Sequence, residues 1–209
     1  SSGWENKVEM GKGRSAGIEF MAQKTAGKTT GWLSYTLSKS DRKFTKGGIN
    51  NGEWFPYKYD RRHSINLTIN HKFSDRIDIG ASWVFYTGGT STIPEEKTTV
   101  IRPHNGANNG FLWYGTYDNT NSSPTIGDVS YIEHRNNFRL PASHRLNLGV
   151  NFNKKTKHGM RTWNISLYNA YNAMNPAWVY RGHNKQGLSV IKKYTLLPLI
   201  PSFTYTYKF

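Results

Sequence analysis

The segment Pro201-Ser202-Phe203-Thr204-Tyr205-Thr206-Tyr207-Lys208-Phe209 decides the fold. After Pro201, every odd-numbered residue is aromatic, and every even-numbered residue carries a hydroxyl or an amine. Because successive side chains of a β-strand point to opposite faces, the segment predicts a strand with one aromatic face and one polar face. Chain ends of soluble domains are usually frayed and polar. The aromatic ending therefore indicates a strand with apolar surroundings on one side and water on the other.

The composition favours β-structure and excludes several classes of protein. The 209 residues include 10 Phe, 13 Tyr and 7 Trp but no Cys, with a formal net charge of +15 and a mean hydropathy of −0.70. Aromatic residues favour strands, and the lack of cysteine excludes disulfide frameworks and thiolate sites. No apolar run approaches the roughly 18 residues of a membrane helix. The positive charge fits either a solvated set of basic loops or an anionic partner, which could be nucleic acid, lipid phosphate or an acidic ligand.

The alternation of the last segment recurs along the chain. In the clearest example, Ile65, Leu67 and Ile69 lie on one side of a predicted strand, with Asn66 and Thr68 on the other. The same pattern predicts seven strands, over residues 12–24, 29–39, 61–73, 76–87, 143–153, 160–171 and 198–209. Several of these are 10–13 residues long, which is near the length of a tilted membrane strand and longer than the roughly 5–6 residues typical of soluble sheets. No segment shows helical periodicity.

The connections between the predicted strands alternate in length. Short turns are predicted at 25–28, 74–75 and 154–159, and long connections at 40–60, 88–137 and 172–187. Antiparallel neighbours place successive connections at opposite ends, so all short turns share one end of the sheet. Short turns at one end and long loops at the other are typical of outer-membrane β-barrels. Within the last connection we expect a hairpin arm in which Trp178–Tyr180 pairs with Leu188–Ile191.

We therefore expect an all-β, antiparallel transmembrane β-barrel, of which residues 1–209 form a carboxy-terminal portion with seven strands. Seven is an odd number, whereas bacterial single-chain barrels have even numbers of strands. An unpaired edge in lipid is also not viable. We expect the earlier strands, including the partner of the last strand, to precede this sequence. The first residues show neither the basic region nor the apolar region of a signal peptide, so we expect either a mature start or a fragment here.

Three motifs resemble the carboxy-terminal end of TonB-dependent outer-membrane receptors. They are Tyr59-Asp60-Arg61-Arg62-His63, the run Trp163–Asn172 with Asn175-Pro176 beyond it, and the ending Leu197–Phe209. The resemblance implies a 22-stranded barrel plugged by an amino-terminal domain, which imports siderophores, cobalamin or glycans across the outer membrane of a Gram-negative cell with energy from TonB. The implied partners are TonB through the plug, the barrel-assembly machinery reading Phe209, lipopolysaccharide and a surface lipoprotein. The resemblance implies no cofactor and no nucleic acid.

The candidate ligand-binding residues lie in the long connections. They are Trp54, Tyr57, Arg102, Trp113, Tyr114, Arg135 and Trp178. We favour loop packing and an interfacial girdle for the aromatic residues, with a stacking platform for a sugar or siderophore as the alternative. The arginines suit an anionic ligand or lipopolysaccharide phosphates equally well. We expect Asp60, Arg61, Arg62 and His63 to form a rim network rather than part of a hydrolase triad.

No catalytic constellation and no metal-binding spacing of histidines is evident, so we predict neither an enzyme nor a metal site. Two rival functions remain. A passive outer-membrane channel would have the same wall without a plug, and a soluble basic β-protein would bind glycans or nucleic acid. Nucleic-acid binding is disfavoured because the aromatic faces carry almost no charge, whereas nucleic-acid proteins interleave basic and aromatic residues.

Overall fold

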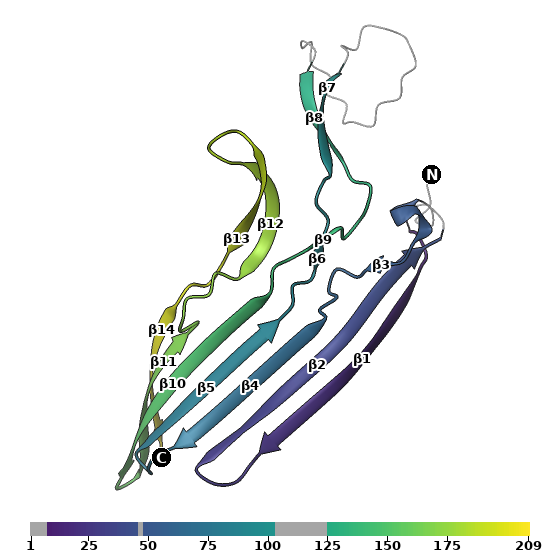
Figure 1. Cartoon of the computed structure of the whole chain (residues 1–209). Coiled ribbons are helices and arrows are strands. Elements are labelled where there is room, and N and C mark those ends of the chain that lie inside the picture. The colour runs from purple at the N-terminus through teal and green to yellow at the C-terminus, as the bar shows by residue number, and fades with distance from the viewer. Residues whose placement is uncertain (1–7, 46–47, 103–124) are drawn as a thin grey trace. The chain divides into compact units, whose positions relative to one another are not determined.

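The computed structural model describes residues 8–45, 48–102 and 125–209, of which 96–102 and 125–130 are described by their backbone alone. The chain divides into two compact units (Figure 1). The first comprises Ser1–Ile93 and His134–Phe209, and the second comprises Pro94–Glu133. No helix within the described part of the chain is long and apolar enough to cross a membrane.

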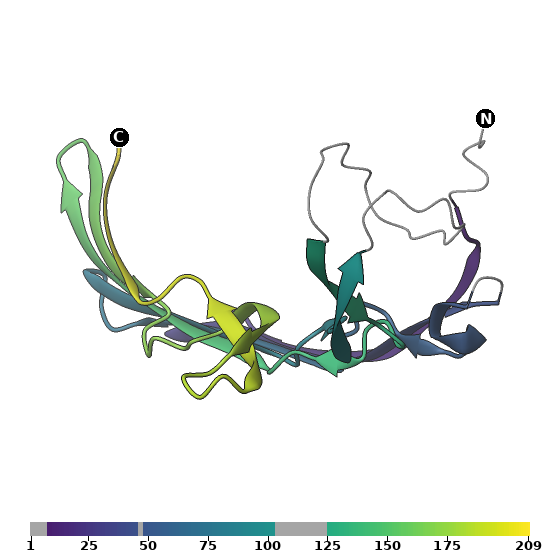
Figure 2. The same cartoon turned by 90° about the horizontal axis from the view of Figure 1, so that it is seen from above.

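Seven long strands of the first unit form one antiparallel sheet, in which each strand pairs with the next long strand along the chain. In order they are β1 (Gly11–Lys24), β2 (Thr29–Phe44), β4 (His63–Lys72), β5 (Ile77–Tyr86), β10 (Ser143–Thr156), β11 (Gly159–Tyr168) and β14 (Ile200–Lys208), and the short strand β3 (Phe55–Pro56) pairs with β2. The prediction of an all-β, antiparallel fold with these seven strands is confirmed. Figure 2 shows that the sheet is curved. Among the described strands, β1 and β14 each have one neighbour, so the sheet is open, and the closed 22-stranded barrel stays a prediction.

The two ends of this sheet differ in the length of their connections. The short-turn end contains residues 25–28, 73–76 and 157–158, and the long-connection end contains the segments after Phe44, Tyr86 and Tyr168. The last connection carries the hairpin of β12 (Pro176–His183) and β13 (Ser189–Thr195), which confirms that an arm forms here. Its register differs from the expected one, because Trp178–Tyr180 pairs with Lys192–Tyr194. A 3-10 turn, η2 (Ile49–Gly52), lies in the first long connection, after β2.

The segment 88–137, expected as a long connection without a strand pattern, contains three short strands, and a fourth follows it directly. They are β6 (Thr90–Ser91), β7 (Glu96–Arg102), β8 (Thr125–Tyr131) and β9 (Phe138–Arg139), paired as β6 with β9 and β7 with β8. The expectation was wrong here because it relied on alternation of apolar residues. β7 and β8 are rich in β-branched residues, which favour strands without such a pattern.

The register joins residues of like character across the whole sheet. On one face, Leu67 of β4 lies opposite Leu33 and Trp83. On the same face, nearer to the β14 edge of the sheet, Ile165 lies opposite Val150 and Phe203. These rows make a continuous apolar face. On the other face Thr68 lies opposite Trp32 and Ser82, and Asn164 lies opposite Asn151 and Thr204, which makes a predominantly polar face.

The apolar face has almost no covering layer. The buried hydrophobic residues of the described chain are Phe55, Ile93 and Ala173, all outside the long strands. By contrast, Phe20 in β1 is 58% exposed and Phe203 in β14 is 64% exposed. Soluble domains bury such a face against a second layer. The first unit is instead a single curved layer, whose apolar face lacks a partner within the described chain.

Candidate functional site

A buried carboxylate, Asp60, organises the long-connection end of the sheet. Asp60 is 1% exposed. It accepts hydrogen bonds from the backbone N–H of Ser40 at 2.7 Å and from Arg139 Nη2 at 2.6 Å, and Arg62 Nε lies 3.1 Å away. Arg139 Nη1 also donates to the backbone carbonyls of Asp60 and Gly88. One carboxylate thus joins the end of β2, the connection before β4 and the segment around β9.

The predicted rim group separates into different contacts. Asp60 pairs with Arg62 as above, while the guanidinium of Arg61 lies 4.0 Å over the ring of Tyr86. His63 Nδ1 is 2.9 Å from the hydroxyl of Tyr35. The strongest partner of Asp60, Arg139, is distant in sequence and was not predicted as part of this group.

A second buried carboxylate, Asp41, explains the surroundings of two candidate ligand residues. Its side chain is 5% exposed and lies 2.9 Å from Arg14 Nη2 and 3.5 Å from Lys39 Nζ. The guanidinium of Arg14 also lies 4.3 Å over the ring of Trp54. In the same way, Arg42 lies 4.1 Å over Tyr57. Because a guanidinium already covers one face of each ring, this geometry favours packing over a sugar-stacking platform for both aromatic residues.

Asparagine side chains fix the segments on either side of the second unit. Asn50 is 4% exposed and donates through Nδ2 to the carbonyl of Arg135 at 3.0 Å, while its Oδ1 accepts the N–H of Arg135 at 2.7 Å. Asn137 makes the same pair of bonds with the backbone of Ile93, both at 2.9 Å. The backbone of candidate Arg135 is therefore held, and its side chain is exposed.

The remaining candidates lie elsewhere. Trp178 belongs to β12, is 50% exposed and stacks on Tyr194 of β13 with the ring centroids 4.3 Å apart. Arg102 ends β7, where its backbone pairs with Thr125, and its side chain lies outside the described atoms. Trp113 and Tyr114 lie outside the described residues. The structure thus places the described candidates on three different connections.

The run Tyr168-Asn169-Ala170-Tyr171-Asn172 forms the turn after β11, which depends on a buried asparagine. Asn169 is 1% exposed and adopts a left-handed conformation with φ of 54°. Its Nδ2 donates to the carbonyls of Ala173 and Leu197, and its Oδ1 accepts the N–H of Ala173 at 2.8 Å. Asn172 Oδ1 accepts the N–H of Leu199 at 3.0 Å. The motif therefore fixes the point where the chain leaves β11 and returns toward β14.

Two histidine–tyrosine pairs lie near the long-connection end. Besides His63 with Tyr35, His144 Nδ1 lies 2.8 Å from the hydroxyl of Tyr171, which also accepts a hydrogen bond from Trp83 Nε1 at 3.1 Å. Strand alternation puts His144 and Trp83 on the apolar face. Aromatic rings with polar tips are typical of a membrane interface.

The polar face carries a ladder of amides and a shallow hollow. Asp78 accepts hydrogen bonds from Asn151 Nδ2 at 2.7 Å and Asn153 Nδ2 at 2.6 Å, and Asn151 in turn accepts one from Asn164 at 2.7 Å. The hollow, of about 250 Å³, includes Thr68, Asn70, Ser82, Asn147 and Ser166 in its lining. It lies where Gly80 and Gly149 are opposite each other and contribute no side chain.

Two cations face each other at the short-turn end. Lys154 of β10 and Arg161 of β11 are direct cross-strand partners, and Tyr207 of β14 lies opposite Arg161 on the other side. Alternation places all three at the border of the apolar face. Within the described residues, neither cation has a carboxylate at ion-pair distance. The nearby turn differs, because Lys72 Nζ contacts Asp75 at 2.9 Å.

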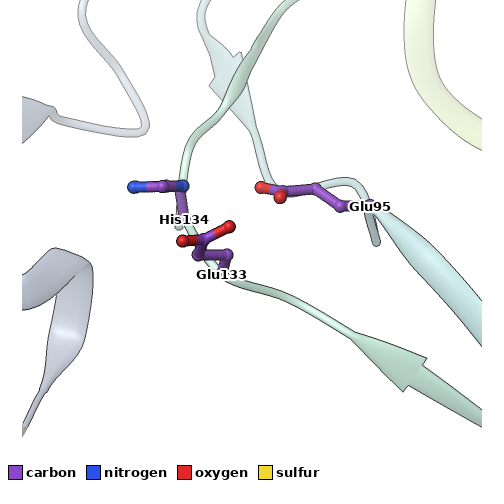
Figure 3. A group of neighbouring side chains, drawn as sticks. All are labelled: Glu95, Glu133 and His134. Carbon is purple, nitrogen blue, oxygen red and sulfur yellow. The ribbon is translucent and has the colours of Figure 1, made fainter.

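One group of possible metal ligands, Glu95, Glu133 and His134, was not predicted from the sequence. Their potential ligand atoms all lie within 4.8 Å of one another, and all three residues are exposed (Figure 3). Exposed acidic groups commonly come together without an ion. We assign no metal site to them.

The described side chains with the deepest burial hold the backbone of the connections, as Asp60, Asn50 and Asn169 show. They are anchors and are not arranged as a nucleophile with its base. No family model matches the chain, and no curated protein and no solved structure is similar to it at a significant level.

Proposed function

We propose that this chain is a carboxy-terminal part of the barrel wall of a TonB-dependent outer-membrane transporter, which imports a scarce nutrient of the siderophore, cobalamin or glycan type. The observation that carries the proposal is the pair of continuous faces on the seven-stranded sheet, one apolar and one polar. In a membrane barrel the apolar face meets lipid and the polar face meets the lumen.

The uncovered apolar face argues against the soluble alternative. Large contiguous apolar patches on soluble monomers are rare and mark interaction surfaces. Here the patch spans the sheet, and its outer rows include stacked aromatic rings, such as Trp163 with Phe203 at 5.0 Å between centroids. Lipid solvates such a surface without a second protein layer.

The transport part of the proposal rests on the resemblance of the three sequence motifs. It brings with it the partners of that class, which are TonB through an amino-terminal plug, the barrel-assembly machinery at Phe209, lipopolysaccharide and a surface lipoprotein. Phe209 is fully exposed, which suits a terminal residue read by another protein. The anchored connections are consistent with outer loops that present ligand-binding residues from fixed positions.

Two substitutions at neighbouring positions test the membrane assignment. Leu67 lies on the apolar face and Thr68 on the polar face at nearly the same height in β4. In the full chain expressed in a Gram-negative cell, we expect Leu67→Arg to destabilise the assembled protein by about 2–4 kcal/mol, because an arginine near the bilayer midplane faces lipid. Thr68→Arg should be tolerated. Urea unfolding of detergent-extracted protein measures both.

Two results would contradict the membrane assignment. One is equal destabilisation by Leu67→Arg and Thr68→Arg. The other is recovery of the wild-type chain in the soluble fraction without detergent.

Deleting part of the second unit tests transport. Replacing residues 95–132 with a short Gly-Ser linker keeps both partners of the Ile93–Asn137 clamp, so the wall should still assemble. We expect ligand uptake to fall while heat-modifiable migration in gels is unchanged. Unchanged uptake would exclude a role for the deleted segment. Uptake by the wild-type protein that continues without TonB would instead support the passive channel.

A further inference from the structure

Lys154 and Arg161 form an unfavourable pair unless an anion accompanies them. They are direct cross-strand partners in the β10–β11 register, where side chains are close enough to interact and like charges destabilise the sheet. No acidic side chain in the described chain compensates them. Such an arrangement stabilises a bound anion by charge, and the anion would relieve the repulsion.

Hydroxyl groups lie beside these two cations. Tyr207 is opposite Arg161 in the β11–β14 register, and its hydroxyl is 3.4 Å from Thr156 Oγ1. Thr156 donates to the carbonyl of Gly159 at 3.0 Å, so Thr156 can only accept in its contact with Tyr207. The tyrosine hydroxyl would turn from this long contact to donate to a bound anion. Two cations and a phenolic hydroxyl suit the oxygen atoms of a phosphate group.

The surface next to the cations is apolar. One step further along the same face, Phe152 lies opposite Trp163. Trp163 stacks on Phe203 with the ring centroids 5.0 Å apart and is tilted against Tyr205 at 4.4 Å. The cations thus border a hydrocarbon-like surface, and a ligand that fits both has a charged head and long apolar chains. A free phosphate or a nucleic acid would use only the charged part.

We propose that Lys154, Arg161 and Tyr207 bind the phosphate of an anionic phospholipid whose acyl chains lie along the apolar face of β10, β11 and β14. This inference rests on the proposed function, because it requires the apolar face to meet lipid. It adds a selective lipid site at the short-turn end. Lys155, on the opposite face of β10, and Lys157, in the turn, take no part.

The test uses the full chain extracted from membranes and delipidated in a non-ionic detergent. Native mass spectrometry measures retention of added phosphatidylglycerol and phosphatidylcholine. We expect the wild-type protein to prefer the anionic lipid on the order of ten-fold, since basic residues near a membrane surface attract anionic lipids. Lys154→Gln/Arg161→Gln should abolish the preference. The control Lys155→Gln/Lys157→Gln removes the same charge from the same hairpin and should retain it.

Several outcomes would overturn the site. Equal retention of the two lipids by the wild-type protein would do so without any variant, as would equal loss in the control pair. Displacement of the lipid by millimolar inorganic phosphate would show that the acyl chains contribute nothing.

If Lys154→Gln/Arg161→Gln does not assemble, Arg161→Lys with Tyr207→Phe provides a second variant, which should weaken the preference. If the protein needs detergent but shows no lipid preference, only the lipid site is contradicted. If the protein is soluble without detergent, the proposed function itself is contradicted.

Discussion

The two ends of the seven-stranded sheet carry basic residues in opposite ways. At the long-connection end, the cations are neutralised by buried carboxylates or covered by rings, as Arg139 and Arg62 are by Asp60 and Arg42 is by Tyr57. At the short-turn end, Lys154 and Arg161 face each other with no carboxylate among the described residues. Positive charge is therefore part of the internal structure at one end and is available to a partner at the other. Net charge alone does not distinguish these roles.

Removing the central carboxylate should break the long-connection end. In Asp60→Ala, Arg139 and the N–H of Ser40 lose a buried partner, so we expect a loss of about 3–5 kcal/mol in the free energy of unfolding. Urea unfolding of detergent-solubilised protein, followed by tryptophan fluorescence, measures it. Asp75→Ala, at the exposed turn of the other end, is the control and should lower the unfolding midpoint only slightly. Equal effects of the two substitutions would remove the contrast between the ends.

The buried asparagine of the turn after β11 should have the next largest effect. Asn169→Ala leaves the carbonyls of Ala173 and Leu197 without their donor, which should cost about 1–3 kcal/mol. The matched control is Asn169→Gly, because glycine adopts the observed φ of 54° without strain but cannot form the hydrogen bonds. Differential scanning calorimetry of both variants separates the two contributions. A glycine variant as stable as the wild type would show that the hydrogen bonds are unimportant.

The exposed ion pair of Lys72 and Asp75, at the short-turn end, should have the smallest effect on stability. The hydrogen bond from Lys72 and the positive charges of Lys72 and Lys155 hold the pKa of Asp75 below its ordinary value of 3.8. Because the folded pKa is the lower one, the stabilisation is fully present above pH 3.8 and is lost as the pH falls through the folded value. The wild type should therefore be slightly more stable than Asp75→Asn at pH 7, and the two should converge in acid. A difference that persists in acid would assign the effect to something other than this charge.

The long strands and their faces could be predicted because alternation is a local property. Each residue from Phe203 to Phe209 reveals its face through its immediate neighbours, and the register then aligns equivalent faces across the sheet. The relation between short and long connections also follows from antiparallel geometry without any coordinates.

The anchors of the connections could not be predicted because they join distant residues. Arg139 reaches Asp60 across 79 positions, and Asn50 reaches Arg135 across 85. Nothing in the sequence around Trp54 indicates that Arg14 would lie over its ring. In the sequence, a buried asparagine such as Asn169 also cannot be distinguished from an asparagine in an exposed loop. The only local sign was the recurrence of asparagine in the motif that ends β11.

The order of the strands has a consequence for folding. Every long strand of the sheet pairs with the next long strand along the chain, so the sheet can grow hairpin by hairpin. Three of these pairs, β1–β2, β4–β5 and β10–β11, close over short turns, which is kinetically favourable, and the other three close over the long connections. Growth of the described strands alone leaves the outer edges of β1 and β14 with rows of unsatisfied backbone groups. In water such edges recruit other strands and promote aggregation. The chain should therefore fold productively only where another strand or a dedicated carrier occupies those edges, which makes assembly, rather than stability, the step most sensitive to its surroundings.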